Sequence, residues 1–247
     1  MQDAIRAAAC FLLIAIAPLA ITAGLASAQN LSSVSGPTVS ADKREVEYRL
    51  GWVPANTGSN ESFGHRIAYG ASLNERTAFK MFANLSDRPG EGLRVQNVNA
   101  QYLIELSPET ARVWQTGIRF DARVSTGPGP DRVGVNWLNQ WPLSDRLRAR
   151  AQFIATRQLG DGARETVDFS FRSSLTWKAT DQFDIALLAF TDLGNTDDFG
   201  IDDRVQEAGP AISGDLPNGY GWTFGTLFGL TERAPDHDLR FWITKSF

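Results

Sequence analysis

The last ten residues of the chain, DLRFWITKSF at positions 238–247, carry a pattern of period two. Apolar and polar side chains alternate along this stretch, and Lys245 is the only charged residue in the apolar row. Successive residues of a β-strand point to opposite faces of a sheet, so the stretch is predicted to be a strand with one apolar face. The apolar row consists of Leu239, Phe241, Ile243 and Phe247.

The terminal position of this strand adds information about export. An alternating last strand that ends in Phe resembles the signal that the barrel-insertion machinery reads in bacterial outer-membrane proteins. We therefore expect these four apolar residues to form a barrel-insertion signal, and the barrel-insertion machinery to be a partner of the chain. The alternative is a soluble protein that ends in Phe by chance.

The same alternation recurs along the chain from Arg44 onward. Within residues 111–124, Ile118 and Phe120 share one face, and Arg119 lies on the opposite face. An amphipathic helix would instead group its charges three and four residues apart, so strands are favoured. Counting such segments predicts about twelve strands, with about ten as the alternative if one pair is misread. They lie near 44–53, 62–71, 76–85, 92–106, 111–124, 131–141, 146–157, 165–177, 183–193, 204–212, 219–230 and 238–247.

The connections between these strands are of two alternating kinds. Tight turns such as Leu143-Ser144-Asp145 contain residues that turn geometry favours. Looser polar stretches, such as 54–61 and 194–203, lie between them. Short turns at one end and longer loops at the other are typical of outer-membrane barrels. The sequence therefore predicts an all-β fold, a closed antiparallel transmembrane β-barrel with short periplasmic turns and longer extracellular loops.

The N-terminus has the features of an export signal. Arg6 precedes an apolar run from Phe11 to Leu25, and Ala26-Ser27-Ala28 supplies the small residues of a cleavage site. We expect residues 1–28 to be a signal peptide that is cleaved before Gln29, with an uncleaved membrane anchor as the alternative. Residues 29–43 lack periodicity and are predicted to be a flexible periplasmic tail, followed by the barrel at 44–247. The predicted location is the bacterial outer membrane.

Composition and charge narrow the class of partner. The 247 residues carry a formal net charge of -4, and the mean hydropathy is -0.22. The acidic balance disfavours nucleic acid as a partner. A helical membrane span needs about 20 apolar residues, and only the N-terminal run approaches that length. For a barrel, the expected partners are outer-membrane lipid and lipopolysaccharide, together with a small solute whose identity the sequence leaves open.

Catalytic and cofactor-binding patterns are not found in the sequence. The only cysteine, Cys10, lies in the predicted signal peptide, so the mature chain has no thiolate ligand. Outer-membrane phospholipases resemble one another in a serine two residues after the catalytic histidine, but Ile67 follows His65 at that spacing. The acidic stretch 195–203 does not match the order of ligands in an EF-hand. We therefore expect no enzyme activity, no cofactor and no metal site.

Charged residues on the polar face of the central strands are the candidate functional residues. If that face lines the lumen, neighbouring arginines would create a positive field that selects anionic solutes. The alternative is that the arginines pair with carboxylates and plug the lumen. The predicted lumen-lining residues are Arg119, Asp121, Arg123, Arg148, Arg150, Asp168 and Arg172.

Four stretches in the last third of the chain resemble a known family. They are residues 191–194 (TDLG), 205–210 (VQEAGP), 225–231 (GTLFGLT) and 236–240 (DHDLR). In this order they resemble the outer-membrane proteins grouped as the MetA-pathway-of-phenol-degradation family and related proteobacterial barrels. The resemblance implies an outer-membrane barrel that passes small hydrophobic or aromatic compounds. Our leading hypothesis is a channel or transport barrel, and the alternative is a plugged structural or adhesion-type barrel that acts through its extracellular loops.

Overall fold

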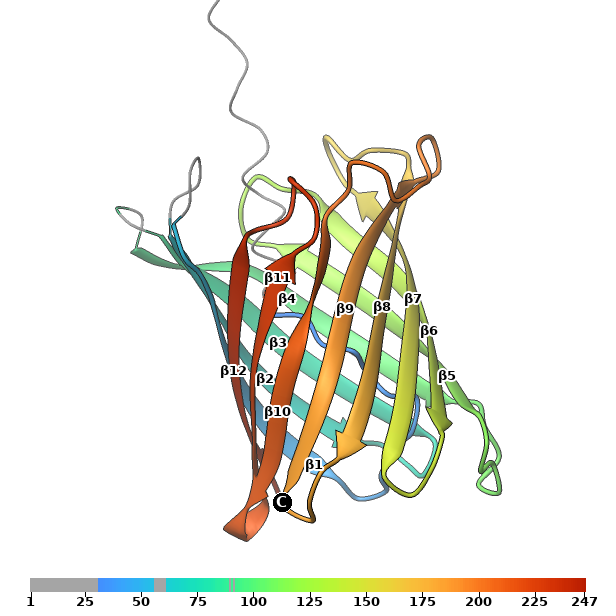
Figure 1. Ribbon diagram of the computed structural model, residues 1–247. Helices are drawn as coiled ribbons and strands as arrows, with labels where there is room; N and C mark the ends of the chain where they lie inside the picture. Colours follow the sequence, from blue (N-terminus) through green and yellow to red (C-terminus); the bar gives the residue numbers. More distant parts are fainter. Residues whose placement is uncertain (1–30, 56–60, 89, 91) are drawn as a thin grey trace, which may run out of the picture.

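Twelve antiparallel strands close into a barrel in the computed structural model, which describes residues 31–55, 61–88, 90 and 92–247 (Figure 1). Each strand pairs with its neighbours in chain order, and β1 pairs with β12, where Val46 lies opposite Lys245. The predicted closed antiparallel barrel of twelve strands is therefore confirmed, and the alternative of ten strands is wrong. The predicted signal peptide and its cleavage site before Gln29 lie outside the described residues.

The strands lie within four residues of their predicted bounds. They are β1 (Arg44–Val53), β2 (Ser62–Ser72), β3 (Thr77–Arg88), β4 (Gly92–Glu105), β5 (Gln115–Ser125), β6 (Asp131–Pro142), β7 (Leu147–Leu159), β8 (Val167–Lys178), β9 (Phe183–Asn195), β10 (Gln206–Leu216), β11 (Tyr220–Gly229) and β12 (His237–Ser246), and the 3-10 turn η1 (Pro217–Gly219) joins β10 to β11.

The connection between β4 and β5 is longer than the sequence predicts. Residues 111–114, expected at the start of a strand, belong instead to a connection that spans 106–114. Trp114 Nε1 donates a hydrogen bond to Asn139 Oδ1 on β6 at 3.0 Å, and Ser107 Oγ donates to Thr116 O at 3.2 Å. These bonds hold the connection against the barrel wall. The alternation in the sequence extends beyond the strand, so it does not mark the residue at which β5 begins.

Three hairpin turns at one end of the barrel share one stabilising contact. Asn74 Oδ1, Ser144 Oγ and Thr180 Oγ1 each accept hydrogen bonds from the two backbone N–H groups that lie two and three residues later. Such side-chain acceptors replace a backbone partner in a tight turn, which is why Asn, Ser and Thr favour these positions. We call this end the turn end, and the opposite end, with connections such as 196–205 and 230–236, the loop end.

The two faces of the barrel wall differ sharply in polarity. Outward-facing Phe120 and Leu187 are 46% and 58% exposed, whereas inward-facing Asn136 and Gln152 have no exposed surface. A soluble sandwich would bury the apolar row and expose the polar one. The opposite arrangement is that of a barrel whose outer wall contacts lipid.

The C-terminal strand β12 follows the same rule. Leu239, Phe241 and Ile243 alternate along the strand with the buried Asp238 and Arg240, so they lie on the outer face. Phe247 follows the end of the strand, and its backbone N–H donates to Arg44 O at 3.1 Å. This placement suits the predicted barrel-insertion signal, whose recognition stays a prediction.

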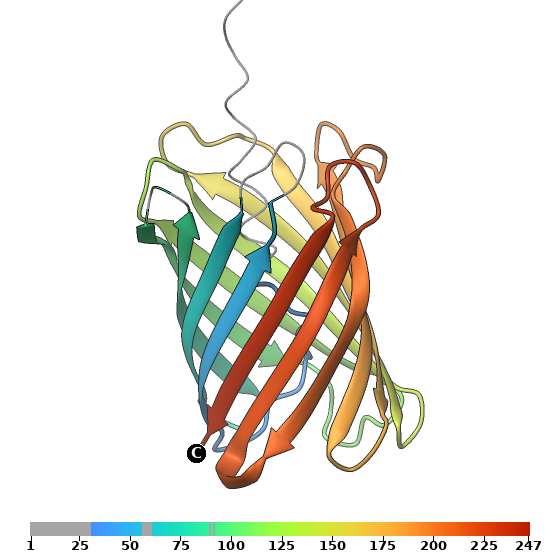
Figure 2. The same ribbon diagram turned by 60° about the vertical axis from the view of Figure 1, so that its left-hand side comes forward.

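Residues 31–40 do not form the flexible periplasmic tail that the sequence predicts. Figures 1 and 2 show this N-terminal stretch, coloured blue, inside the ring of strands from both viewing directions. Leu31 is only 2% exposed, and Ser32 and Val34 are buried as well. A stretch without periodicity can be ordered when other parts of the chain bind its backbone groups, and here the barrel wall does so. We call residues 31–40 the lumenal segment.

In the described part of the chain, no helix is long and apolar enough to cross a bilayer. Among the same residues, no three His, Cys, Asp or Glu side chains are placed together so that they could hold a metal ion.

Candidate functional site

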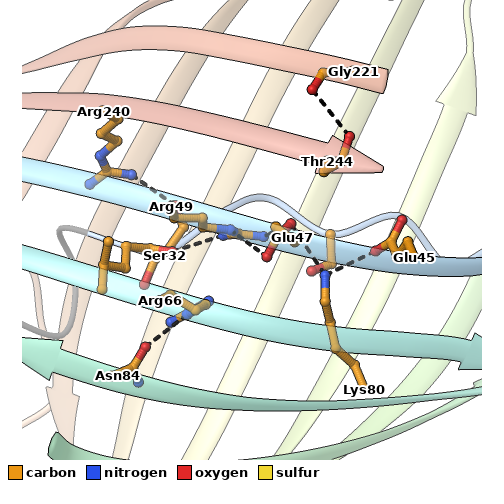
Figure 3. Close-up of polar contacts among 12 residues, drawn as sticks. Ser32, Glu45, Glu47, Arg49, Arg66, Lys80, Asn84, Gly221, Arg240 and Thr244 are labelled. Atoms are coloured by element: carbon orange, nitrogen blue, oxygen red, sulfur yellow. Dashed lines mark hydrogen bonds and ion pairs between the residues drawn. The ribbon is translucent and has the colours of Figure 1, made fainter. Parts of the chain in front are cut away.

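Arginines of the barrel wall bind the lumenal segment through three consecutive backbone carbonyls of the segment. Arg49 Nη1 donates to Leu31 O at 2.8 Å, and Arg240 Nη1 donates to Ser32 O at 2.9 Å. Arg172 Nη1 donates to the next carbonyl, Ser33 O, at 3.4 Å. The three arginines come from β1, β12 and β8, so the segment is held from several sides of the wall. Figure 3 shows Arg49 and Arg240 reaching toward the stretch around Ser32.

The second half of the segment is bound by other polar groups. Ser35 N–H donates to Gln152 Oε1 at 3.1 Å, and Arg119 Nη1 donates to Ser35 Oγ at 2.7 Å. Nearer the turn end, Val39 N–H donates to Glu105 Oε2 at 2.7 Å. The segment therefore passes from the middle of the barrel to the end at which β1 begins.

Glycines in the wall leave room for the segment. A Cβ on Gly64 of β2 would lie 3.3 Å from Leu31 Cδ1. A Cβ on Gly117 of β5 would lie 3.0 Å from Pro37 O. Glycine is common in strands where another backbone approaches closely, and both positions fit that role.

Five arginines gather around the inner end of the segment, and we call them the arginine cluster. The charges of Arg49, Arg119 and Arg240 all act on Arg172, and those of Arg49, Arg119 and Arg172 act on Arg66. Like charges at short range repel one another, so the cluster favours any group that brings electron-rich oxygen atoms into the lumen.

Aromatic rings support the guanidinium groups of the cluster. Arg49 lies 4.3 Å from the ring centroid of Trp242, and Arg66 lies 4.1 Å from that of Phe82. The ring of Phe190 contacts two guanidinium groups: its centroid lies 4.7 Å from Arg240 and 5.7 Å from Arg172. Cation–π contacts of this kind orient a guanidinium without neutralising it.

Ion pairs in the lumen join residues of the same strand or of strands two apart in the wall. Three pairs join residues two positions apart on one strand, namely Arg49 with Glu47 at 2.8 Å, Arg119 with Asp121 at 2.7 Å, and Arg240 with Asp238 at 2.6 Å. Lys80 of β3 bridges Glu45 and Glu47 on β1, as Figure 3 shows. None of the ion pairs between described residues of the central lumen spans it from wall to wall.

The seven predicted lumen residues all lie on the inner face, but in different surroundings. Arg119, Asp121 and Arg172 belong to the contacts just described. Arg150 lies beside the segment, with Nε donating to Gln140 Oε1 at 2.7 Å, and a Cβ on Gly36 would lie 2.9 Å from its Nη2. Arg148 is nearer the turn end, and its Nε has no hydrogen-bond partner among the described residues.

The two remaining predicted residues lie toward the loop end. Arg123 on β5 is directly opposite Arg132 on β6, and the Nε atom of each lacks a partner within the described chain. Asp168 pairs with Arg164 from the β7–β8 connection at 3.1 Å. The structure thus brings Arg119, Asp121 and Arg172 together and separates the other four from them.

Several residues of the site are not among those that the sequence analysis singles out. Arg49, Arg66 and Arg240 complete the arginine cluster, the rings of Phe190 and Trp242 contact it, and the lumenal segment supplies its acceptors. One sequence signal was available for Arg49, because in a strand it shares a face with Glu47 two positions earlier. The segment offered no such signal, since its partners lie far away along the chain.

Part of the inner wall, on β9, β10 and β11, carries apolar side chains beside these charges. Leu188 and Phe190 of β9, Ala211 of β10 and Leu227 of β11 are buried together, and Val34 of the segment packs against them. Because these side chains face inward, part of the lumen is lined by hydrocarbon and part by guanidinium groups. The lumen therefore combines cationic and apolar surfaces around one point.

The two histidines lie on different strands, His65 on β2 and His237 on β12. His65 Nδ1 lies 2.8 Å from Tyr48 Oη, and His237 packs edge-on against Phe228.

At the loop end, Arg233 donates a hydrogen bond to Asp203, which raises the pKa of Arg233 and joins the connection 230–236 to the connection 196–205.

Comparison with known proteins supports the fold. An outer-membrane channel from Pseudomonas putida F1 superimposes with a TM-score of 0.66 at 10% identity, covering 88% of this chain and 100% of that one. The NanC porin gives a TM-score of 0.61 at 11% identity, covering 82% and 100%. The KdgM porin gives 0.59 at 7% identity, covering 82% and 99%.

The sequence itself has no match of this kind. No protein-family model matches the chain, and no curated protein matches it. The resemblance to the MetA-pathway-of-phenol-degradation family is therefore not confirmed. At such low identities the structural likeness is one of fold, namely the fold of outer-membrane porins and channels.

Proposed function

We propose that the chain is an outer-membrane channel for small solutes, whose lumen is narrowed by its own lumenal segment. The observation that carries this proposal is the arrangement of charge in the lumen. A permanent plug of paired charges would place carboxylates across the barrel from the arginines. Instead, the ion pairs join residues of one strand or of strands two apart in the wall, and a thin stretch of backbone occupies the centre.

The alternative is a barrel that the segment closes permanently and that acts through its extracellular loops. The specific observation in its favour is the number of hydrogen bonds that hold the segment: Arg49, Arg119, Arg172 and Arg240 donate to it, and Gln152 accepts from it. Under either reading, outer-membrane lipid and lipopolysaccharide are the proposed surroundings of the apolar outer wall. We infer no catalytic role. Passage of small hydrophobic or aromatic compounds, as the family resemblance implies, belongs to the channel reading.

The experiment that separates the two is conductance of the purified protein in planar bilayers, with a measurement of anion-to-cation selectivity. Stepwise conductance with a preference for anions is the result expected of the proposed channel. A protein that inserts and shows the heat-modifiable mobility of a folded barrel, yet conducts nothing, would establish the plugged alternative.

Reversing two charges near the turn end is expected to change the selectivity of the channel. The double variant Arg148→Glu/Arg150→Glu replaces two inward-facing cations by anions, so the permeability ratio of chloride to potassium should fall on the order of threefold or more. The ratio is read from the reversal potential in a KCl gradient.

A matched control carries the same change of charge outside the lumen. Arg112 and Arg146 are exposed residues of the connections at the turn end, so Arg112→Glu/Arg146→Glu should alter the ratio far less. An unchanged ratio in a conducting Arg148→Glu/Arg150→Glu barrel would remove these two residues from the conduction path.

A further inference from the structure

The contacts of the lumenal segment indicate which chemical groups the arginine cluster can bind. Three successive carbonyl oxygens face the guanidinium groups of Arg49, Arg240 and Arg172. A neutral carbonyl is a weaker acceptor for a guanidinium than a carboxylate, which accepts two charge-assisted hydrogen bonds from the planar fork. The carbonyls therefore occupy positions where the oxygen atoms of an anionic solute would be held more strongly.

The cluster also has unbalanced charge for such a solute to neutralise. Arg172 has no carboxylate within ion-pair distance among the described residues, and neither has Arg66, whose Nε donates to the Asn84 amide oxygen at 2.8 Å. Among the described residues, Arg172 donates a hydrogen bond to Ser33 O, and its guanidinium lies 5.7 Å from the ring centroid of Phe190. A carboxylate placed beside Arg172 would thus relieve repulsion from Arg119 and Arg240.

The apolar surface next to these cations defines the rest of the solute. Val34 follows Ser33 directly and packs onto Leu188, Phe190 and Leu227. When the segment is displaced, this surface loses its cover and becomes available to another hydrocarbon group. A ligand that replaces residues 33 and 34 together would carry an anionic head and a compact apolar body.

We propose that the lumen binds small carboxylic acids with a compact apolar body, in competition with the lumenal segment. The carboxylate pairs with Arg172 and Arg240, and the apolar body occupies the place of Val34. The segment is the competitor that occupies this site in the absence of ligand. This inference rests on the proposed channel function and names the class of solute for that channel.

Equilibrium dialysis of the detergent-solubilised protein tests the proposal without requiring conduction. The probe is radiolabelled benzoate, with labelled benzyl alcohol and acetate as matched ligands that lack the charge and the apolar body. Benzoate should bind at least about tenfold more tightly than either, because both surfaces contribute. Equal binding of benzyl alcohol or of acetate would overturn the proposal, and so would absence of benzoate binding.

Variants locate the site. Arg172→Gln should weaken benzoate binding about tenfold or more, whereas Arg148→Gln, outside the cluster, should not. Arg172→Lys keeps the charge but loses the planar guanidinium that donates two hydrogen bonds to a carboxylate, so an intermediate loss of affinity is expected. If Arg172→Gln fails to form a heat-modifiable barrel, Arg172→Lys provides the test in its place. Deletion of residues 31–40 should tighten binding, because the competitor is gone. Equal affinity in the deleted and complete proteins would overturn the competition.

Failure of this proposal and failure of the proposed channel give different results. A barrel that conducts but binds no benzoate remains a channel for another class of solute. A barrel that binds benzoate in competition with the segment but never conducts has the binding site without the channel function.

Discussion

Deletion of residues 31–40 is expected to raise the single-channel conductance on the order of threefold or more, because the open cross-section of a barrel of this size is small and the segment fills its centre. The deletion leaves β1 intact, since that strand begins at Arg44. The barrel wall keeps its hydrogen-bond ladders, including the closing pair of β1 and β12. Lumenal arginines that lose their carbonyl acceptors become hydrated in the wider lumen, so the folded barrel should survive.

A length-matched variant controls for the effect of the deletion on folding. Replacing residues 31–40 by an equally long Gly-Ser sequence keeps a chain in the lumen but removes Leu31, Val34 and Pro37, which are all buried. That variant should fluctuate between the closed and the open conductance levels. If the deleted protein forms a heat-modifiable barrel whose conductance does not exceed that of the complete chain, the segment does not narrow the conduction path.

Substitution Arg240→Met is expected to lower the free energy of unfolding by about 3 kcal/mol or more, the cost of breaking a buried charge pair. Arg240 is 2% exposed, and its guanidinium lies 2.6 Å from Asp238 and 3.9 Å from Glu207. Methionine fills a similar volume but leaves both carboxylates without their cation. The measurement is urea unfolding of the purified barrel, with linear extrapolation to water.

Two further variants make this prediction specific. Adding Asp238→Asn to the Arg240→Met protein removes one of the unpaired charges and should restore part of the lost stability. Arg233→Met breaks the exposed pair with Asp203 at the loop end and should leave the unfolding midpoint unchanged. A midpoint for Arg240→Met equal to that of Arg233→Met would mean that the lumen hydrates the carboxylates freely.

The fold was predictable because the rule behind it is local. In β7, Arg148, Arg150 and Gln152 alternate with Ala149 and Ala151, and a strand is the conformation that separates such residues onto two faces. Which face is inside is not contained in the alternation. The expectation that the polar face is internal rested on the export signal, the terminal Phe and the alternation of short turns with longer loops, and the structure agrees with it.

The candidate site was predictable only in part, because half of it is made by contacts between distant parts of the chain. Arg119 and Arg172 could be placed on the lumenal face from strand periodicity. The binding of Ser35 by Gln152 joins residues 117 positions apart, and no local pattern predicts it. A stretch rich in Ser, Gly and Pro therefore indicates a flexible tail when only its own composition is considered.

The pairing of charge within single strands bears on how such a barrel is assembled. The pairs are Glu47 with Arg49, Arg119 with Asp121, and Asp238 with Arg240. Each of these three strands, β1, β5 and β12, brings its own counter-ion, since both partners lie on one face two residues apart. An unpaired guanidinium is costly to hold near hydrocarbon, whereas a hydrogen-bonded pair is much less so. The cations of these three pairs are therefore neutralised before the barrel closes, and an error in strand order leaves these pairs intact.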